Sequence, residues 1–105
     1  MILVRHEIGE VLRDLRLQKG RTLRQVASRA SVALGYLSEV ERGQKEASSE
    51  ILASVADALD VPISTIMREV GDRISVLEGL QTFPDVVPDD LAGLDSDFQP
   101  ELSLR

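Results

Sequence analysis

Residues 22–43 read TLRQVASRASVALGYLSEVERG, two short amphipathic stretches separated by a tight break. Thr22 and Gln25 have the spacing of a capping box, in which each side chain satisfies a backbone N–H of the other residue, so a helix is predicted to begin there. Apolar residues then recur with helical spacing, and Gly43 follows the second stretch at a position suited to a left-handed C-cap. Two helices joined by a turn of about three or four residues form a helix-turn-helix.

Three further helices are predicted around this pair. The segment from about His6 to Lys19 has one apolar face and ends at Gly20. Ser48 is predicted to cap a fourth helix that ends at Val61-Pro62, and Ser64 to cap a fifth. The chain is therefore expected to be all-α, with five helices around one small core.

A resemblance to a known family rests on the string VALGYLSEVERG, which begins at Val32. It resembles the Cro/C1-type (XRE-like) helix-turn-helix repressors, and the match extends from about Ile8 to Met67. This resemblance implies a lambda-repressor-like DNA-binding domain over residues 6–67, with the helix-turn-helix at about 23–42. Fragments such as ERGQKEASSE are similar to the actinobacterial regulators of Clp protease genes, which implies activation of genes for proteolysis and stress response.

The distribution of charge is compatible with DNA binding, although the net charge of −6 is not. Residues 1–45 hold nine Lys or Arg and five Asp or Glu, whereas residues 46–81 hold two and seven. The basic part coincides with the helix-turn-helix. One face of the domain is therefore predicted to be positive while the rest of the chain is acidic.

The second helix of the motif is predicted to place its N-terminal part in the major groove, where it reads base edges. Leu34 offers apolar surface to a thymine methyl group, and Glu39 is able to accept a hydrogen bond from cytosine N4. An alternative role for Glu39 is a surface charge paired with Arg42 or Lys45. The predicted base-facing residues are Ala33, Leu34, Gly35, Ser38 and Glu39.

Phosphate contacts are expected around this helix, and the residues proposed for them are Thr22, Arg24, Tyr36, Arg42, Gln44 and Lys45. Arg24 is expected to replace a glutamine that the family often has after the helix cap. Tyr36 has an alternative role in which its ring packs against the preceding helix junction. The resemblance also implies a structural ion pair between Arg16 and Glu41.

A second interface is predicted in the segment 68–81, because the apolar pattern continues there with heptad-like spacing as Met67, Val70, Ile74 and Leu77. This seam predicts a homodimer that reads inverted half-sites about 34–36 Å apart. The alternative is that the fifth helix folds back on its own core. Gly71 and Gly79 argue against one continuous helix, since each costs up to about 1 kcal/mol relative to alanine.

Residues 82–105 contain three prolines, six acidic residues and one arginine, and are expected to form a disordered acidic tail. Apolar residues scattered among the acids suggest a recruitment motif for RNA polymerase or a recognition tag for Clp protease. The alternative is a tail that only increases solubility.

Several classes of function are disfavoured by composition. The chain has no cysteine and a single histidine, so a disulfide framework, a zinc site and an enzyme active site are not expected, nor is a cofactor or small-molecule ligand. Without a membrane span or secretion signal, the protein is expected to be cytoplasmic. The predicted function is a dimeric regulator on a palindromic operator; the alternative is an antitoxin that regulates its own gene and binds a toxin through its tail.

Overall fold

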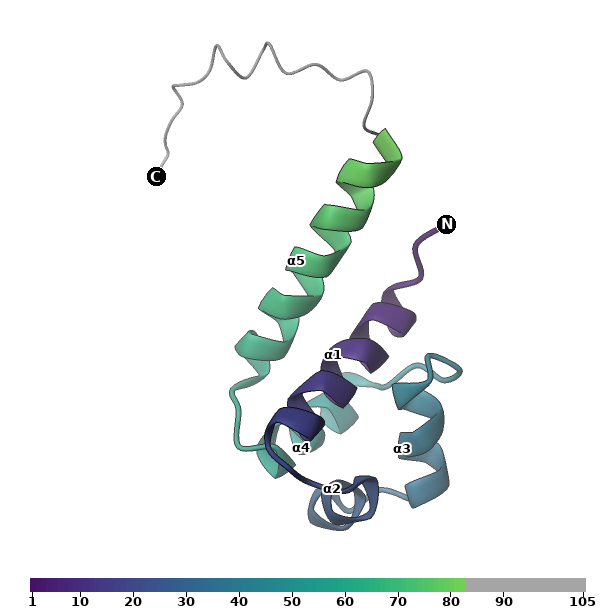
Figure 1. The fold of residues 1–105 in the computed structure, drawn as a ribbon. Helices are drawn as coiled ribbons and strands as arrows, with labels where there is room; N and C mark the ends of the chain where they lie inside the picture. The colour runs from purple at the N-terminus through teal and green to yellow at the C-terminus, as the bar shows by residue number, and fades with distance from the viewer. Residues whose placement is uncertain (83–105) are drawn as a thin grey trace.

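The computed structural model describes residues 1–82, which form five helices (Figure 1). The prediction of an all-α, five-helix domain is confirmed for this part of the chain. The acidic tail lies outside the described residues from position 83 onward. No helix within the described part is long and apolar enough to span a membrane. The helices are α1 (Val4–Gln18), α2 (Leu23–Ala30), α3 (Leu34–Glu41), α4 (Ser49–Ala58) and α5 (Ile63–Thr82).

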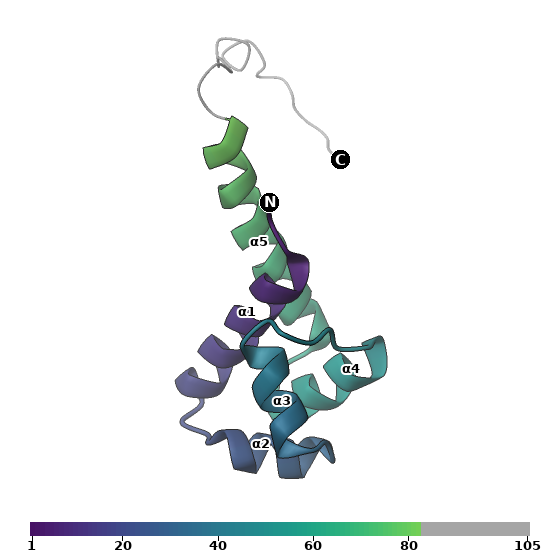
Figure 2. The same ribbon diagram turned by 90° about the vertical axis from the view of Figure 1, so that its right-hand side faces the viewer.

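One core joins all five helices. Leu12 of α1, Leu37 of α3 and Ile66 of α5 are fully buried in it, together with Val26 of α2 and Leu59 at the end of α4. Complete burial of such a side chain contributes about 1.5–3 kcal/mol. Both ribbon views show α1 and α5 side by side, with α2, α3 and α4 gathered at one end of the pair (Figures 1 and 2).

The helix-turn-helix begins and ends as predicted. Thr22 N–H donates to Gln25 Oε1 at 2.9 Å, and Gln25 N–H donates to Thr22 Oγ1 at 3.0 Å, which completes the capping box. Gly43 follows α3 with φ of +75°, in the left-handed region that glycine enters without a steric cost. Ser31 adopts the same region, with φ of +58°, in the turn between α2 and α3.

Three predicted helix ends are wrong. The first helix begins at Val4, earlier than the predicted start near His6. The end of α4 is Ala58, because Leu59 serves as its C-cap and Asp60 turns the chain with φ of +59°, before Val61-Pro62 is reached. Ser64 does not cap α5, since that helix already begins at Ile63, directly after the fixed φ of Pro62.

The fifth helix is continuous through Gly71 and Gly79, although these glycines argue against one continuous helix. Around Gly71, contacts with α1 account for this, because they exceed the small intrinsic penalty of one glycine. Arg73, which lies between the glycines, donates from Nε to Glu7 Oε1 of α1 at 3.1 Å. Position 67, the predicted end of the domain, therefore lies inside an uninterrupted helix.

The predicted dimer seam does not form one exposed face. Val70 is only 5% exposed and belongs to the core of its own protomer, and Ile74 packs against that core. Met67 remains 42% exposed, while Leu77 is half-buried. The alternative, in which α5 folds back on its own core, is therefore correct for Val70 and Ile74, because α1 occupies the space beside them.

Candidate nucleic-acid interface

The recognition helix is fixed from its inner side. Leu37 and Val40 are buried, which orients the opposite side of α3 toward the surface. Gly35 has open space where a Cβ would stand, so a ligand backbone is able to approach closely there. Of the predicted base-facing residues, those at the start of the helix are exposed and those one turn later are half-buried: Ala33, Leu34 and Gly35, then Ser38 and Glu39.

The C-terminal end of α3 lies directly against α1. A Cβ built on Gly9 would stand 2.5 Å from the carbonyl oxygens of both Val40 and Glu41, closer than any side chain tolerates. Position 9 therefore requires glycine. The sequence interpretation missed this contact, although a glycine inside a helical pattern is a signal of close packing.

Arg16 and Glu41 join the same two helices through a paired hydrogen bond. Arg16 Nε lies 2.8 Å from Glu41 Oε2, and a second guanidinium nitrogen lies 3.0 Å from Oε1. The two side chains are only 14% and 8% exposed. The hydrogen bond to the carboxylate raises the pKa of Arg16 above its usual value. This is the ion pair that the family resemblance implied.

Several residues proposed to contact DNA bind one another in the free protein. Arg42 donates to Ser38 Oγ at 2.7 Å and to Gln44 Oε1 at 3.4 Å. Lys45 Nζ lies 3.9 Å from Glu39 Oε1, so the alternative pairing of Glu39 with this lysine is present. Exposed pairs of this kind contribute little to stability, typically about 0–1 kcal/mol. They are easily exchanged for contacts with a charged ligand.

Tyr36 has a defined role inside the protein. Its hydroxyl donates a hydrogen bond to the backbone carbonyl of Glu46 at 2.9 Å, and its ring packs against the core. The ring thus has a packing role, against the core as a whole. The hydroxyl hydrogen that a phosphate contact would require already has an acceptor.

The N-terminus of α2 opens onto a basic depression. Arg24 is exposed and, within the part of the chain that the structure describes, takes part in no ion pair. The capping box uses the N–H groups of Thr22 and Gln25, which leaves those at the first two helical positions as open donors. The depression has a volume of about 560 Å³ and is lined by Lys19, Gly20, Arg21, Arg24, Gln25, Ser28 and Arg29.

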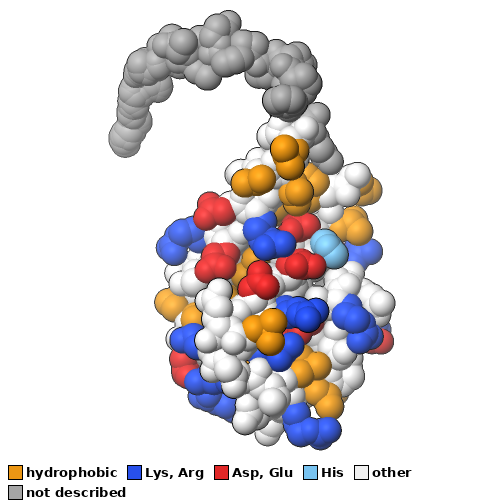
Figure 3. Space-filling model, viewed as in Figure 1, with side chains coloured by type: hydrophobic (Ala, Val, Ile, Leu, Met, Phe, Trp, Pro, Cys, Tyr) orange, Lys and Arg blue, Asp and Glu red, His pale blue; other side chains and the backbone are white. Residues whose placement is uncertain are grey.

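Two arginines of this depression are held by one carboxylate. Arg21 donates to Asp60 Oδ2 at 2.6 Å and to the carbonyl of Ala58, and Arg29 lies 3.6 Å from Asp60 Oδ1. The hydrogen bond from Arg21 holds the pKa of Asp60 below its usual value. Side chains of Lys and Arg gather at the α2 end of the molecule in the space-filling view (Figure 3).

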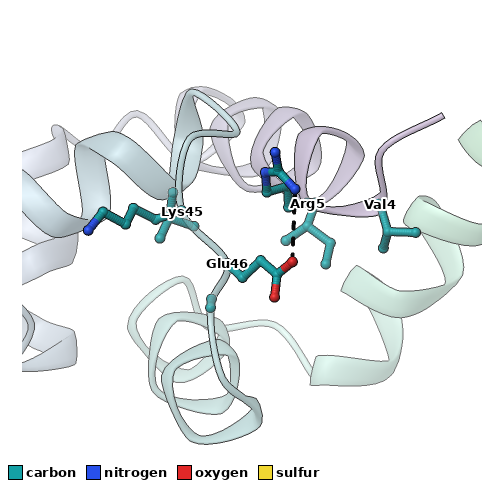
Figure 4. A pocket seen from close by; sticks show the side chains of 7 residues that line it. Val4, Arg5, Lys45 and Glu46 are labelled. Atoms are coloured by element: carbon teal, nitrogen blue, oxygen red, sulfur yellow. Dashed lines mark ion pairs between the residues drawn. The ribbon is translucent and has the colours of Figure 1, made fainter. Parts of the chain in front are cut away.

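The loop after α3 is tied to α1 by a residue that the sequence interpretation did not single out. Arg5 Nε donates to the carbonyl of Gly43 at 3.0 Å, and a further guanidinium nitrogen lies 3.9 Å from Glu46 Oε2 (Figure 4). Arg5 and Gly43 lie 38 residues apart in the sequence, so no local pattern predicts the contact.

Within the described residues, no group of three His, Cys, Asp or Glu is arranged to hold a metal ion.

Comparison with known proteins gives this surface its context. A helix-turn-helix family model matches residues 12–66. The transcriptional regulator ClgR of Mycobacterium tuberculosis (strain H37Rv) is 50% identical over 78 residues, which cover 74% of this chain and 70% of that protein. The crystal structure of the clp gene regulator ClgR from Corynebacterium glutamicum has a TM-score of 0.72 and 41% identity, covering 77% of this chain and 86% of that chain.

A third likeness is to the fold alone. The structure of C.Esp1396I bound to a 25 base pair operator site is 20% identical, has a TM-score of 0.65 and covers 70% of this chain and 97% of that chain. The family model and the two ClgR relatives, together with the capped helix pair and the exposed face of α3, show the family of this protein. It belongs to the Cro/C1-type helix-turn-helix family, and is a DNA-binding transcriptional regulator rather than an enzyme.

Proposed function

We propose that this protein binds an inverted-repeat operator as a homodimer and regulates genes for Clp protease. The observation that carries the proposal is the exposed N-terminal half of α3, presented over buried Leu37 and Val40 and flanked by the basic depression at α2. The likeness to ClgR from two organisms supports the choice of target genes.

Base reading is assigned to the exposed side of α3. Leu34 and Ala33 supply apolar surface for thymine methyl groups, and Gly35 permits close approach of the backbone. Glu39 reads cytosine only after it leaves Lys45. Because most of these groups are small, much of the affinity comes from phosphate contacts of Arg24, Arg42, Gln44 and Lys45 and from the N-terminus of α2 around Thr22.

Selection from a randomised duplex library tests this assignment. Wild-type protein is expected to enrich one inverted repeat, and Glu39→Gln to change the preferred base at one position of each half-site. Asp57→Asn, which removes an exposed acid on α4, is the matched control and leaves the preference unchanged. An unchanged preference for Glu39→Gln removes this residue from base reading, whereas no enrichment by wild type contradicts operator binding.

Genome-wide mapping of bound DNA tests the target genes. Binding sites are expected upstream of genes for Clp protease subunits, and expression of these genes is expected to fall when the regulator is deleted. Bound sites that lie only elsewhere would reject this part of the proposal and leave sequence-specific binding intact.

Homodimer formation is assigned to the far end of α5 in place of the predicted seam. Val76 and Leu80 lie one helical turn apart and are 63% and 69% exposed. Figure 1 shows this end of α5 projecting past the start of α1, and Figure 3 shows hydrophobic side chains gathered there. Exposed apolar surface of this kind marks interaction sites, and a second copy supplies the second half-site reader.

Sedimentation of a variant with Val76→Asp and Leu80→Asp tests this interface. A monomer is expected, while Met67→Asp, which also places an acid at an exposed apolar position of α5, is expected to remain a dimer. Ile74 is unsuitable for this purpose, because its substitution would disturb the protomer core. A double variant that keeps the mass of a dimer would exclude the far end of α5 as the interface.

The tail is assigned a separate role as the segment recognised by RNA polymerase or by Clp protease. It holds six acids and one arginine, with apolar residues between them. A chain that stops after Gln81 is expected to bind operator normally but to lose promoter activation or to persist longer in cells. If neither activation nor lifetime changes, the tail serves only for solubility.

A further inference from the structure

The loop 42–48 between α3 and α4 carries Gln44 and Lys45, both proposed above to contact phosphates. Figure 4 shows the side chains of Lys45 and Glu46 extending in opposite directions, with Glu46 toward Arg5. The loop thus has an outer side that is free for DNA and an inner side that faces the first turn of α1. The position of the loop relative to α3 decides where the side chains of Gln44 and Lys45 lie.

Apolar packing supports this loop only partly. Gly43 packs closely against His6 of α1, but beyond it a cavity of about 270 Å³ lies between the loop and α1. The cavity is lined by Val4, Arg5, Ile8, Val40, Lys45, Glu46 and Ala47. Polar contacts at the edges of the cavity therefore help to fix the conformation of this part of the loop.

Three such contacts reach the loop backbone or its acidic residue. Arg5 Nε donates to Gly43 O at 3.0 Å, Tyr36 Oη donates to Glu46 O at 2.9 Å, and the Arg5 guanidinium lies 3.9 Å from the Glu46 carboxylate. Two of the acceptors are backbone carbonyls on either side of Gln44 and Lys45. We name this set, formed by Arg5, Tyr36 and their acceptors, the loop clamp.

We propose that Arg5 is a positioning residue for DNA binding, which acts through the loop clamp by holding Lys45 where it reaches a phosphate. The inference rests on the proposed function, because it concerns phosphate contacts on the operator. A planar guanidinium suits this role, since one group donates in two directions at once. Its charge is not required to touch DNA.

The affinity of Arg5→Met for the selected operator tests the proposal. Binding is expected to weaken roughly tenfold per protomer, the scale of one charge-assisted hydrogen bond. The slope of log affinity against log salt concentration is expected to fall by about one per protomer, the value for one lost phosphate contact. Arg68→Met, which removes an exposed arginine of α5, is the matched control and is expected to leave both quantities unchanged.

A double-mutant cycle with Lys45→Met separates positioning from direct contact. If Arg5 acts through Lys45, Arg5→Met costs little affinity once Lys45 is already replaced. Losses that add in full would overturn the proposal, because Arg5 would then contribute independently of the loop. Arg5→Lys keeps the charge but not the planar group, so it is expected to recover little affinity; full recovery would equally overturn the proposal.

Amide chemical shifts of Gly43 to Glu46 in the free protein give a readout without DNA. They are expected to change in Arg5→Met while the melting temperature stays within a few degrees of wild type; unchanged shifts would reject the loop clamp. Failure of the two proposals is distinguishable. Wild type that selects no operator refutes the proposed function and the inference together, whereas equal affinity of wild type and Arg5→Met refutes the inference alone.

Discussion

The α2–α3 unit and the α1–α5 pair are stabilised in different ways. The first unit is ordered by local contacts, such as the capping box between Thr22 and Gln25, and by small buried side chains. The second combines buried core side chains such as Ile66 with the ion pairs of Arg73. Arg73 contacts Glu7, Glu10 and Asp14 across α1 at distances of 3.1, 3.5 and 3.6 Å. Glu7 is buried, whereas its partner Arg73 is half-buried.

This difference separates two kinds of rigidity. Buried, closely packed contacts open only when the domain unfolds, whereas partly exposed polar contacts exchange with water and open locally. The DNA-facing half is thus expected to keep its shape until global unfolding. The far half of α5 is expected to open first, although it is part of one continuous helix.

The largest effect is expected where α1 meets α3. Arg16→Ala or Glu41→Ala leaves a charge without its partner in a largely buried site, and each should lower the free energy of unfolding by about 3 kcal/mol. Replacing both residues together should cost less than the sum of the single changes, because no uncompensated charge remains. Urea denaturation measures all three variants, and additive losses would show that the pair does not act as a unit.

Gly9→Ala should have the next largest effect. The new methyl group would meet two backbone carbonyls, so α1 and α3 must separate, at a cost of about 1–3 kcal/mol. Gly71→Ala is the matched control within α5, because nothing lies within 4 Å of its Cβ position. There alanine should stabilise the helix by about 0.5–1 kcal/mol. Thermal melting measures both variants. Melting temperatures that shifted in the same direction would contradict the contrast between the two glycine positions.

A smaller and more local effect is expected for Arg73→Met. Loss of the guanidinium leaves buried Glu7 without its hydrogen-bond donor and should cost about 1–2 kcal/mol. Hydrogen exchange should accelerate mainly in residues 71–82, while α2 and α3 keep their protection. Equal acceleration in both units would mean that they open together, and Arg68→Met controls for the loss of charge.

The smallest effect concerns pH. The folded-state pKa of Asp60 is lowered by Arg21, so its contribution to stability is present above the unfolded pKa of about 3.9 and is lost as pH falls through the lower folded value. Asp60→Asn should therefore reduce the difference in melting temperature between neutral pH and about pH 3. An unchanged difference would show that other carboxylates govern acid stability.

The same contrast explains how much of the protein the sequence predicts. The capping box, Gly43 and the buried stripe of α3 depend on residues close together in the chain, and each was predicted correctly. The argument from Gly71 against one continuous α5 is wrong, because intrinsic preference is weaker than packing against α1.

Contacts between distant parts of the chain were not predictable from local pattern. Arg73 meets Glu7 across 66 residues and Arg5 meets Gly43 across 38, and the sequence around each arginine resembles any exposed helix face. Val70 was assigned to a dimer seam for the same reason: an apolar stripe shows that a face is covered but not by which partner. The Arg16–Glu41 pair was anticipated only through the family resemblance.

The contact at Gly9 has a consequence for how binding preference changes between related proteins. Because α1 and α3 meet backbone to backbone there, the depth and tilt of the recognition helix are set by the absence of one methyl group on a helix that is not assigned to base reading. A larger residue at position 9 would push the C-terminal end of α3 away from α1, at a cost in stability, and change which base edges the helix meets. The preferred operator would then change although every base-facing side chain stayed the same.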